Sequence, residues 1–172
     1  GREMHGDALP DVYGGFGTSL RFYGVDFSIG FTYQLGGQVL DQGYMFYMDS
    51  PAGTSTGNNY HHDLLNSWTP ENSGSNIPRF AYNDSNQAAV SDRFLTSASY
   101  LNIQNITLGY TLPKRITRKF LVENLRIYFA CDNVWYWSKR QGLDPRQAIN
   151  GITNPYYYAP IRTFSGGVTV TF

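Results

Sequence analysis

Residues 25–35 read VDFSIGFTYQL, and this stretch decides the fold class of the chain. Apolar side chains stand at every second position, with polar residues or glycine between them. A period of two is that of a β-strand with one apolar face. A strand that crosses a bilayer at a tilt needs about 9 to 11 residues, whereas strands of soluble proteins commonly have about 5 or 6. The stretch therefore predicts a membrane-spanning strand.

Four further segments show the same alternation, at residues 15–23, 101–112, 125–137 and 163–172. The connections between the five predicted strands alternate in length, with a tight turn at residues 22–25 and a short connection at 113–124. Between these lie long connections at about residues 37–97 and 138–160, the first with a possible helical turn near residues 61–68. Transmembrane barrels have short periplasmic turns and long extracellular loops. We therefore predict an all-β fold, an antiparallel transmembrane β-barrel segment whose two long loops are extracellular.

The alternation also predicts which side chains meet lipid. One face of the predicted barrel wall should contact lipid, and it holds Phe27, Ile29, Phe31, Val168 and Val170. The other face should line the lumen or a plug, and it holds Ser28, Thr32, Thr169 and Thr171. This division follows because lipid-facing and lumen-facing residues alternate along such strands.

The composition agrees with this prediction and excludes some functions. Charged residues make up 15% of the chain and aromatic residues 16%, whereas soluble domains carry about 25% charged residues. The formal net charge is +0, which argues against nucleic acid as a partner. Cys131 is the only cysteine, so no internal disulfide can form. The chain starts at Gly1 without a signal peptide, and we expect it to begin within a larger protein.

No enzymatic or metal site is predicted. The residues Gly53, Ser55 and Gly57 match the letters of a hydrolase elbow, but the acid and histidine that must follow in that order are missing. His61, His62 and Asp63 are adjacent, and histidines adjacent on a helix point in different directions. We therefore expect no catalytic residue, no cofactor and no metal ligand.

One basic cluster leaves two interpretations open. It consists of Lys114, Arg115, Arg118 and Lys119, with Ile116, Phe120 and Leu121 interleaved. The cluster could be an amphipathic turn close to anionic headgroups. The favoured interpretation is a solvated periplasmic turn whose charges block the pairing of strand edges.

Several short motifs occur in an order that resembles a known family. They are Tyr100-Leu101-Asn102-Ile103-Gln104-Asn105-Ile106-Thr107-Leu108-Gly109-Tyr110, then Leu125-Arg126-Ile127-Tyr128 with Asp132-Asn133-Val134-Trp135, then Gly142-Leu143-Asp144-Pro145, and finally Pro160-Ile161-Arg162-Thr163-Phe164. The residues of these motifs, and the order in which the motifs follow one another, resemble the C-terminal barrel segment of SusC/RagA-family TonB-linked outer-membrane proteins. The resemblance covers most of the chain, apart from residues 43–91.

The resemblance implies that residues 1–172 form about five strands of a TonB-dependent transporter barrel of about 22 strands. It implies four partners: the remainder of the barrel and its plug, a SusD-like surface lipoprotein, TonB through N-terminal parts that this sequence lacks, and outer-membrane lipid. The implied function is import of glycans or peptides across the outer membrane of a Gram-negative, Bacteroidetes-type cell. No ligand-contacting residue can be transferred from the motifs, because they mark strands and turns.

Two hypotheses concern the loops and the fold. Aromatic side chains offer broad contact surface with a polar handle, so the candidates for contact with substrate or with the lipoprotein are Tyr60, Trp68, Tyr82, Tyr156, Tyr157 and Tyr158. Packing between the loops or against the lipoprotein is the favoured role for them. The alternative to the barrel is a secreted soluble β-sandwich that binds carbohydrate.

Overall fold

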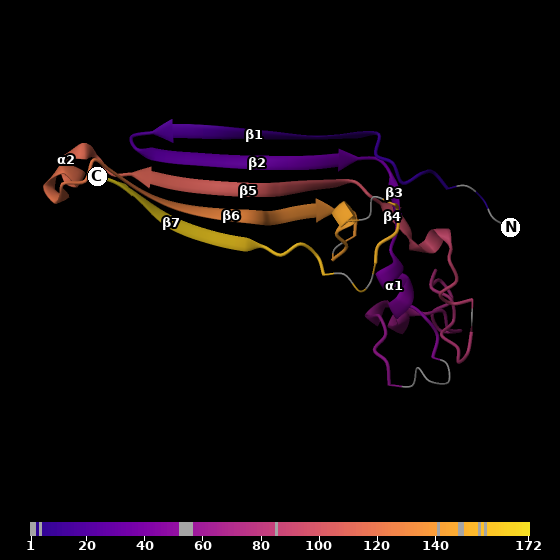
Figure 1. Cartoon of the computed structure of the whole chain (residues 1–172). Coiled ribbons are helices and arrows are strands. Elements are labelled where there is room, and N and C mark those ends of the chain that lie inside the picture. Colours follow the sequence, from indigo (N-terminus) through magenta and orange to yellow (C-terminus); the bar gives the residue numbers. More distant parts are fainter. Residues whose placement is uncertain are drawn as a thin grey trace.

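A computed structural model describes residues 3, 5–51, 57–84, 86–140, 142–147, 150–154, 156 and 158–172. Its main feature is a five-stranded antiparallel sheet of order β1-β2-β5-β6-β7, which forms one long layer in Figure 1. The strands are β1 (Val12–Phe22), β2 (Val25–Leu35), β5 (Tyr100–Thr111), β6 (Asn124–Ser138) and β7 (Thr163–Thr171). Strands adjacent in the sheet follow one another in the chain, so the topology is a meander.

The five predicted strands are confirmed, and β2 has the predicted bounds. β1 begins three residues before the predicted start at Gly15, because Val12, Tyr13 and Gly14 pair with Leu35, Gln34 and Tyr33. The glycines in this strand had weakened its apolar alternation. Long strands and neighbour-only pairing are the properties of a barrel wall.

The register gives the sheet two unlike faces, since residues directly opposite one another in an antiparallel pair lie on the same face. Phe27 lies opposite Leu20 and Leu108, and Leu108 lies opposite Phe129. We call this side the apolar face; on it lie Phe16, Phe27, Ile29, Phe31, Ile106, Leu108, Ile127, Phe129, Val168 and Val170. Many of these are exposed, as at Phe16 (57%) and Val168 (60%), so the apolar face has no core above it.

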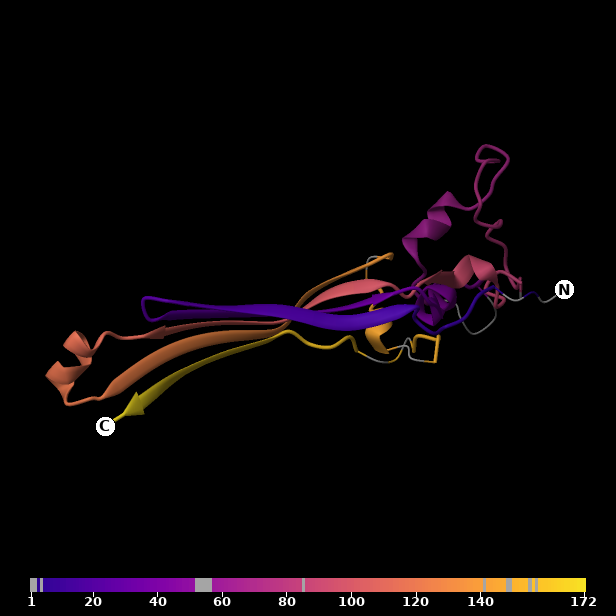
Figure 2. The same ribbon diagram turned by 90° about the horizontal axis from the view of Figure 1, so that it is seen from above.

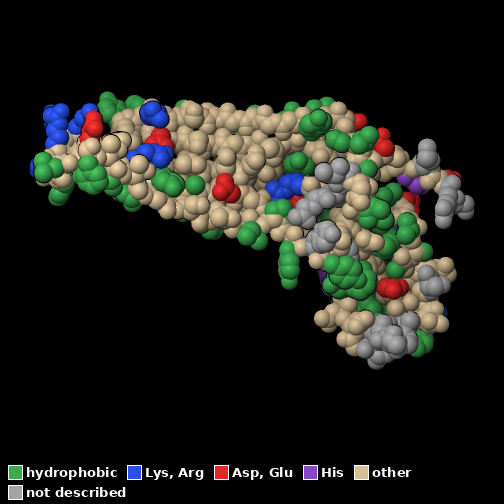
Figure 3. Space-filling model, in the orientation of Figure 1, with side chains coloured by type: hydrophobic (Ala, Val, Ile, Leu, Met, Phe, Trp, Pro, Cys, Tyr) green, Lys and Arg blue, Asp and Glu red, His purple; other side chains and the backbone are tan. Residues whose placement is uncertain are grey.

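The opposite side, which we call the polar face, carries small and polar side chains. Its members include Ser28, Thr32, Asn102, Thr107, Arg126, Ser165 and Thr169. The sheet surface turned to the viewer in Figure 3 is mostly tan, with few hydrophobic side chains in its middle. The polar face therefore has the character of a surface that meets water or polar groups.

One irregularity interrupts the alternation. The register shifts between Gly30 and Phe31 on β2 and between Ile103 and Asn105 on β5. Gln104 is the extra residue of β5, and Asn133 on β6 adopts a positive φ of 53° nearby. A bulge of this kind bends a strand and re-aims its side chains. The apolar face therefore continues across the sheet, although the alternation of apolar residues along β5 shifts by one residue at Gln104.

The connection between β2 and β5 contains structure of its own. It holds the two-stranded sheet of β3 (Gln38–Leu40) and β4 (Leu95–Ser97), the helix α1 (Gln42–Tyr47) and the 3-10 helices η2 (His62–Asn66) and η3 (Asp92–Phe94). The η2 helix lies where a helical turn was expected. The small core of the molecule lies mostly here and in the connection after β6, with Val39, Met48, Phe94, Ala98 and Leu143 buried. Figure 1 shows these loops at one end of the sheet.

The other end of the sheet carries the short connections. There the chain turns between β1 and β2 at Tyr23 and Gly24, and between β5 and β6 through α2 (Lys114–Thr117) and η4 (Arg118–Phe120). The C-terminus lies at this end too, and the sheet is a thin curved layer when seen from above (Figure 2). Among the described residues, no helix is long and apolar enough to cross a membrane.

The β-sandwich alternative is wrong in its architecture. Among the described residues the second sheet has only two strands of three residues each. Such a sheet cannot cover a five-stranded layer of strands that are nine to fifteen residues long. No part of the chain that the structure describes covers the apolar face with a second layer.

Candidate functional site

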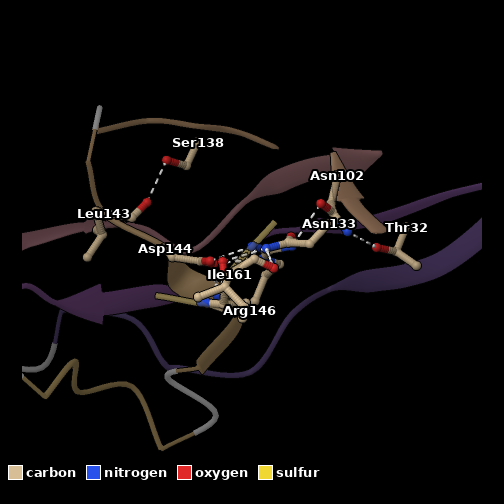
Figure 4. A network of polar contacts seen from close by, with 9 residues as sticks. Thr32, Asn102, Asn133, Ser138, Leu143, Asp144, Arg146 and Ile161 are labelled. Carbon is tan, nitrogen blue, oxygen red and sulfur yellow. Dashed lines mark hydrogen bonds and ion pairs between the residues drawn. The ribbon is translucent and has the colours of Figure 1, made fainter. Parts of the chain in front are cut away.

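The polar face and the two long connections meet at one end of the sheet, around Arg146. This residue lies in the 3-10 helix η5 (Pro145–Gln147), within the connection between β6 and β7. Its Nη1 donates to Asn102 Oδ1 of β5 (2.8 Å) and to Asn133 Oδ1 of β6 (2.6 Å). Its Nε donates to Asp144 Oδ1 (2.8 Å), and Figure 4 shows these contacts converging on one guanidinium. Arg146 therefore ties the loop to the polar face.

The surroundings of Arg146 make this contact a buried one. Only 14% of the Arg146 side chain and 4% of the Asp144 side chain are exposed. The hydrogen bond to Asp144 raises the pKa of Arg146, so the guanidinium stays charged. Asn102 continues the network, since its Nδ2 donates to Thr32 Oγ1 of β2 (3.1 Å). One loop residue thus links the β6–β7 connection with three strands of the sheet.

The two long connections also bind to one another through backbone groups. The Leu40 N–H donates to the Gly151 carbonyl (2.7 Å), and the Thr153 N–H donates to the Leu40 carbonyl (3.0 Å). The Gln42 N–H donates to Thr153 Oγ1 (3.0 Å). These bonds join β3 and the start of α1 to the β6–β7 connection. The loops therefore form one connected layer at this end of the sheet.

A second arginine strengthens the junction of the loops. Arg140 Nη1 donates to Asp41 Oδ2 (3.0 Å), and its guanidinium lies 3.9 Å from the Tyr44 ring centroid. The Tyr44 hydroxyl donates to Asp63 Oδ2 (2.8 Å). Burial raises the pKa of Tyr44, and the hydrogen bond to Asp63 raises it further. Arg140 is thereby connected through α1 to the 3-10 helix η2.

Two cavities lie near this junction. One has a volume of about 410 Å³ and lies between the two connections, lined by Asp41, Gly43, Asp144, Ile152, Thr153 and Asn154. The other has a volume of about 490 Å³ and follows the end of β6, lined by Trp135, Tyr136, Trp137, Pro160 and Arg162. Sites for small ligands commonly measure about 300 to 1,000 Å³. The first cavity offers carboxylate, amide and hydroxyl groups to a polar ligand.

One of the aromatic candidates for substrate or lipoprotein contact, Tyr156, lies at the junction of the two long connections. Tyr156 lies 6.4 Å from Phe46 of α1, ring centroid to ring centroid, in an edge-on arrangement. Its side chain is otherwise exposed, at 78%. Tyr157 lies outside the described residues. Tyr158 is 94% exposed.

The three candidate aromatic residues of the connection between β2 and β5 follow helix α1 in the chain. Tyr60 packs edge-on against Phe80, with 5.6 Å between the ring centroids. The Trp68 N–H donates to the Ile77 carbonyl (2.9 Å), and the Trp68 side chain is partly exposed. Tyr82 is 70% exposed.

The side chains of His61, His62 and Asp63 lie close together, whereas adjacent residues on a helix would point in different directions. Candidate ligand atoms of the three residues lie within 4.8 Å of one another, because His61 precedes η2 with an extended backbone. The Asp63 N–H donates to His61 Nδ1 (3.2 Å), and Tyr44 donates to the Asp63 carboxylate. Protein groups already use much of the trio's bonding capacity. In the elbow-like motif at residues 53–57, residues 53–56 lie outside the described residues.

A polar cluster at the other end of the sheet was not expected from the sequence. Arg126 of β6 pairs with Asp26 of β2 across the intervening strand, with 3.1 Å between Nε and Oδ1. Gly109 of β5 lies opposite Asp26, while Arg126 lies opposite Thr111, so the Arg126 side chain passes over Gly109 to reach the carboxylate. A Cβ at Gly109 would lie 2.5 Å from the guanidinium and 2.5 Å from the carboxylate. The glycine therefore makes the ion pair possible.

Sequence reasoning missed the residues that hold the loop to the sheet. Asn102 falls on the polar side of a predicted strand, which is a weak signal because lumen positions are polar in general. Asp144 and Arg146 lie in a connection without periodicity, where spacing gives no indication of partners. Asn133 falls in phase with the apolar positions of β6, such as Cys131 and Trp135, so the alternation gave no sign of its contact with Arg146.

Comparison with known proteins gives relatives of one kind. No family model matches the chain. The chain is similar to TonB-dependent receptor P3 of Formosa agariphila, with 26% identity over 181 residues and 99% of this chain covered. It is also similar to the TonB-dependent receptor SusC of Bacteroides thetaiotaomicron, with 28% identity over 164 residues and 94% of this chain covered. The chain spans 17% and 15% of the lengths of these relatives.

Solved structures share the fold. The RagAB peptide importer in its open-open state matches with a TM-score of 0.80 at 23% identity, covering 98% of this chain and 18% of that chain. The RagAB peptide transporter matches with a TM-score of 0.81 at 23% identity. These relatives are named as receptors, an importer and a transporter, not as enzymes. The chain is thus similar in sequence to TonB-dependent receptors such as SusC, and its sheet has the fold of part of the RagAB importer structures.

Proposed function

We propose that this chain forms part of the wall of a TonB-dependent importer in the outer membrane. In this proposal the apolar face contacts lipid, the polar face lines the lumen around a plug, and the two long connections are extracellular loops. The observation that carries the proposal is the register of the five strands, which gathers exposed apolar side chains on one face and polar ones on the other. Lipid on one side and a polar interior on the other require this division.

The edges of the sheet support a role within a larger barrel. Among the residues that the structure describes, β1 and β7 each pair on one side only. An unpaired strand edge in lipid leaves backbone groups unsatisfied, at several kcal/mol each. We infer that the remainder of the barrel pairs with both edges. TonB would act through parts of the importer that lie outside this sequence.

The joined loops suit the outer mouth of the importer. We infer that a SusD-like lipoprotein rests on them and that the cargo is a glycan or a peptide. The carboxylate, amide and hydroxyl groups around the 410 Å³ cavity favour a cargo with many hydrogen-bonding groups. The aromatic candidates serve chiefly in packing, and the contact between Tyr156 and Phe46 supports this role.

A matched pair of substitutions in the full-length importer tests the orientation of the wall. Ile106 lies on the apolar face between Ile29 and Cys131, and Thr107 lies on the polar face between Ser28 and Ala130. This pair suits the test better than Val168 and Thr169, because Thr169 lies opposite Arg126 and a new arginine there would meet a like charge. An arginine at a lipid-facing midplane site costs about 2 to 4 kcal/mol.

Ile106→Arg should reduce the amount of heat-modifiable, membrane-inserted importer, and uptake should fall with it. Thr107→Arg should insert at nearly the wild-type level. The amount of inserted protein is measured in outer-membrane fractions by its shift on electrophoresis without heating. Equal insertion of the two variants would show that the sheet does not separate lipid from an aqueous interior.

A further inference from the structure

The short connection between β5 and β6 carries a concentration of positive charge. Residues 113–123 contain Lys114, Arg115, Arg118 and Lys119 and one acidic residue, Glu123, so four positive charges and one negative charge give a net charge of +3. The whole chain has a net charge of +0. Lys and Arg side chains gather with hydrophobic ones at this end of the molecule (Figure 3). We call residues 113–123 the basic turn.

The basic turn also presents large apolar side chains to solvent. Ile116 is 45% exposed, Phe120 72% and Leu121 88%. At the same end of the sheet the β1–β2 turn exposes Phe22 (73%) and Tyr23 (86%). Apolar and basic side chains that alternate on one surface are the signature of a segment lying in a membrane interface.

The backbone of the turn holds Leu121 in an unusual conformation. Its φ of 60° and ψ of 27° place it in the left-handed region, at the C-cap of η4. The Val122 N–H donates to the Thr117 carbonyl (3.2 Å), a pattern that usually has glycine at the left-handed position. A leucine is strained there, and its side chain gains no burial within this chain. The fold therefore presents Leu121 outward.

The orientation of the basic turn is fixed by the sheet. Thr117 is only 2% exposed, and the Leu112 N–H donates to the Leu125 carbonyl (2.9 Å) to close the ends of β5 and β6. The turn therefore projects beyond the strand ends, next to the C-terminus, in both ribbon views (Figures 1 and 2). On a membrane-spanning wall this position is the interface opposite the long loops.

We propose that the basic turn is an interfacial anchor that binds anionic phospholipid. Phe120 and Leu121 enter the acyl boundary, and the four basic side chains bind headgroup phosphates. This inference rests on the proposed function, because it requires the strands to cross the bilayer. Charge complementarity decides the partner: a net charge of +3 beside apolar side chains fits a negative, amphipathic surface.

Hydrogen–deuterium exchange on the full-length importer in nanodiscs tests the anchor. One set of discs contains phosphatidylcholine alone, and the other contains equal parts of phosphatidylcholine and phosphatidylglycerol. The amides of residues 114–123 should exchange at least about fivefold more slowly in the anionic discs, the effect expected from a single basic side chain at a charged surface. High salt should remove most of the difference.

Two pairs of variants separate lipid binding from a purely structural role. Arg115→Gln/Lys119→Gln should lose the slowing in anionic discs, whereas the control Arg79→Gln/Lys139→Gln, which removes two charges exposed in the loops, should keep it. Leu121→Asn should speed exchange of the turn in both kinds of disc, although asparagine tolerates the left-handed conformation. The control is Leu65→Asn, which changes a leucine of equal exposure (88%) in η2.

Some results would overturn the anchor. These are equal exchange of the wild-type turn in both discs, slowing that persists in Arg115→Gln/Lys119→Gln, and protection that inorganic phosphate alone reproduces in neutral discs. Protection seen only after a soluble periplasmic protein is added would assign the turn to that protein instead. Failure of the wild-type importer to enter either disc would count against the proposed function and not specifically against the anchor.

Discussion

At the scale of single residues, the polar face depends on a few contacts that span several strands. Asp26 and Arg126 are two strands apart, and they meet because Gly109 has no side chain between them. Arg146 bridges β5, β6 and its own loop in the same way at the other end. Such contacts connect strands or loops that do not pair with one another through their backbones.

Gly109→Ala should separate Asp26 from Arg126. The added Cβ would lie 2.5 Å from atoms of both partners, so one of them must move away. In the full-length importer the midpoint of heat unfolding should fall, and adding Arg126→Met should lower it little further, since the pair is already broken. The control is Gly166→Ala, whose Cβ would meet only the Tyr128 carbonyl at 3.7 Å. Full additivity of the first two changes would contradict the role of Gly109.

Arg146→Met should release the β6–β7 connection from the polar face. The substitution leaves Asp144, which is 4% exposed, without its charged partner, and breaking a buried pair in this way costs about 3 kcal/mol. Limited proteolysis should then cut residues 139–162 faster than in wild type. Asp144→Asn/Arg146→Met should recover part of the resistance, because no buried charge is left. Unchanged proteolysis of Arg146→Met would contradict the anchoring role.

At the scale of elements, the alternation of apolar residues was sufficient to predict all five long strands and their order of connection. It succeeded because long stretches of each strand place apolar side chains at every second position. It could not locate the bulge at Gln104, since one inserted residue reverses the phase without changing composition. The short strands β3 and β4 were missed because three residues are too few to show a period.

The functional residues of the loops were harder to predict than the strands. The aromatic side chains identified candidates, but the contacts of Arg140 with Asp41 and of Arg146 with Asn102 span 99 and 44 positions of the chain. No local pattern encodes such pairs. Only the fold brings them together.

The three consecutive tyrosines of the β6–β7 connection are expected to support both lipoprotein binding and uptake. Changing Tyr156, Tyr157 and Tyr158 together to Ser in the full importer should weaken both lipoprotein association and uptake, because the contact of Tyr156 with Phe46 joins the two loops. Association is measured by co-purification, and uptake by accumulation of labelled cargo. Loss of uptake with the lipoprotein still bound would assign these residues to cargo contact instead. No change in either would remove them from the mechanism.

At the scale of the whole molecule, the described part of the chain forms an open sheet with two unpaired edges. Small closed barrels need at least about eight strands, and the described residues supply five long ones. The isolated chain should therefore fail to fold as a monomer in detergent micelles. Its electrophoretic mobility should not change on heating. A stable, heat-modifiable monomer would show that the sheet closes without further strands.

The most direct test of the central claim is the accessibility of β5 in the full importer to a lipid-soluble relaxation agent. A spin label is placed in turn at each position from Leu101 to Tyr110, and collisions with oxygen are measured in a bilayer. We predict high oxygen accessibility at Leu101 and Ile103, then a reversal of phase at the Gln104 bulge, then high values at Ile106, Leu108 and Tyr110. Uniform accessibility, or high values at Asn102, Asn105 and Thr107, would contradict a wall with lipid on its apolar face.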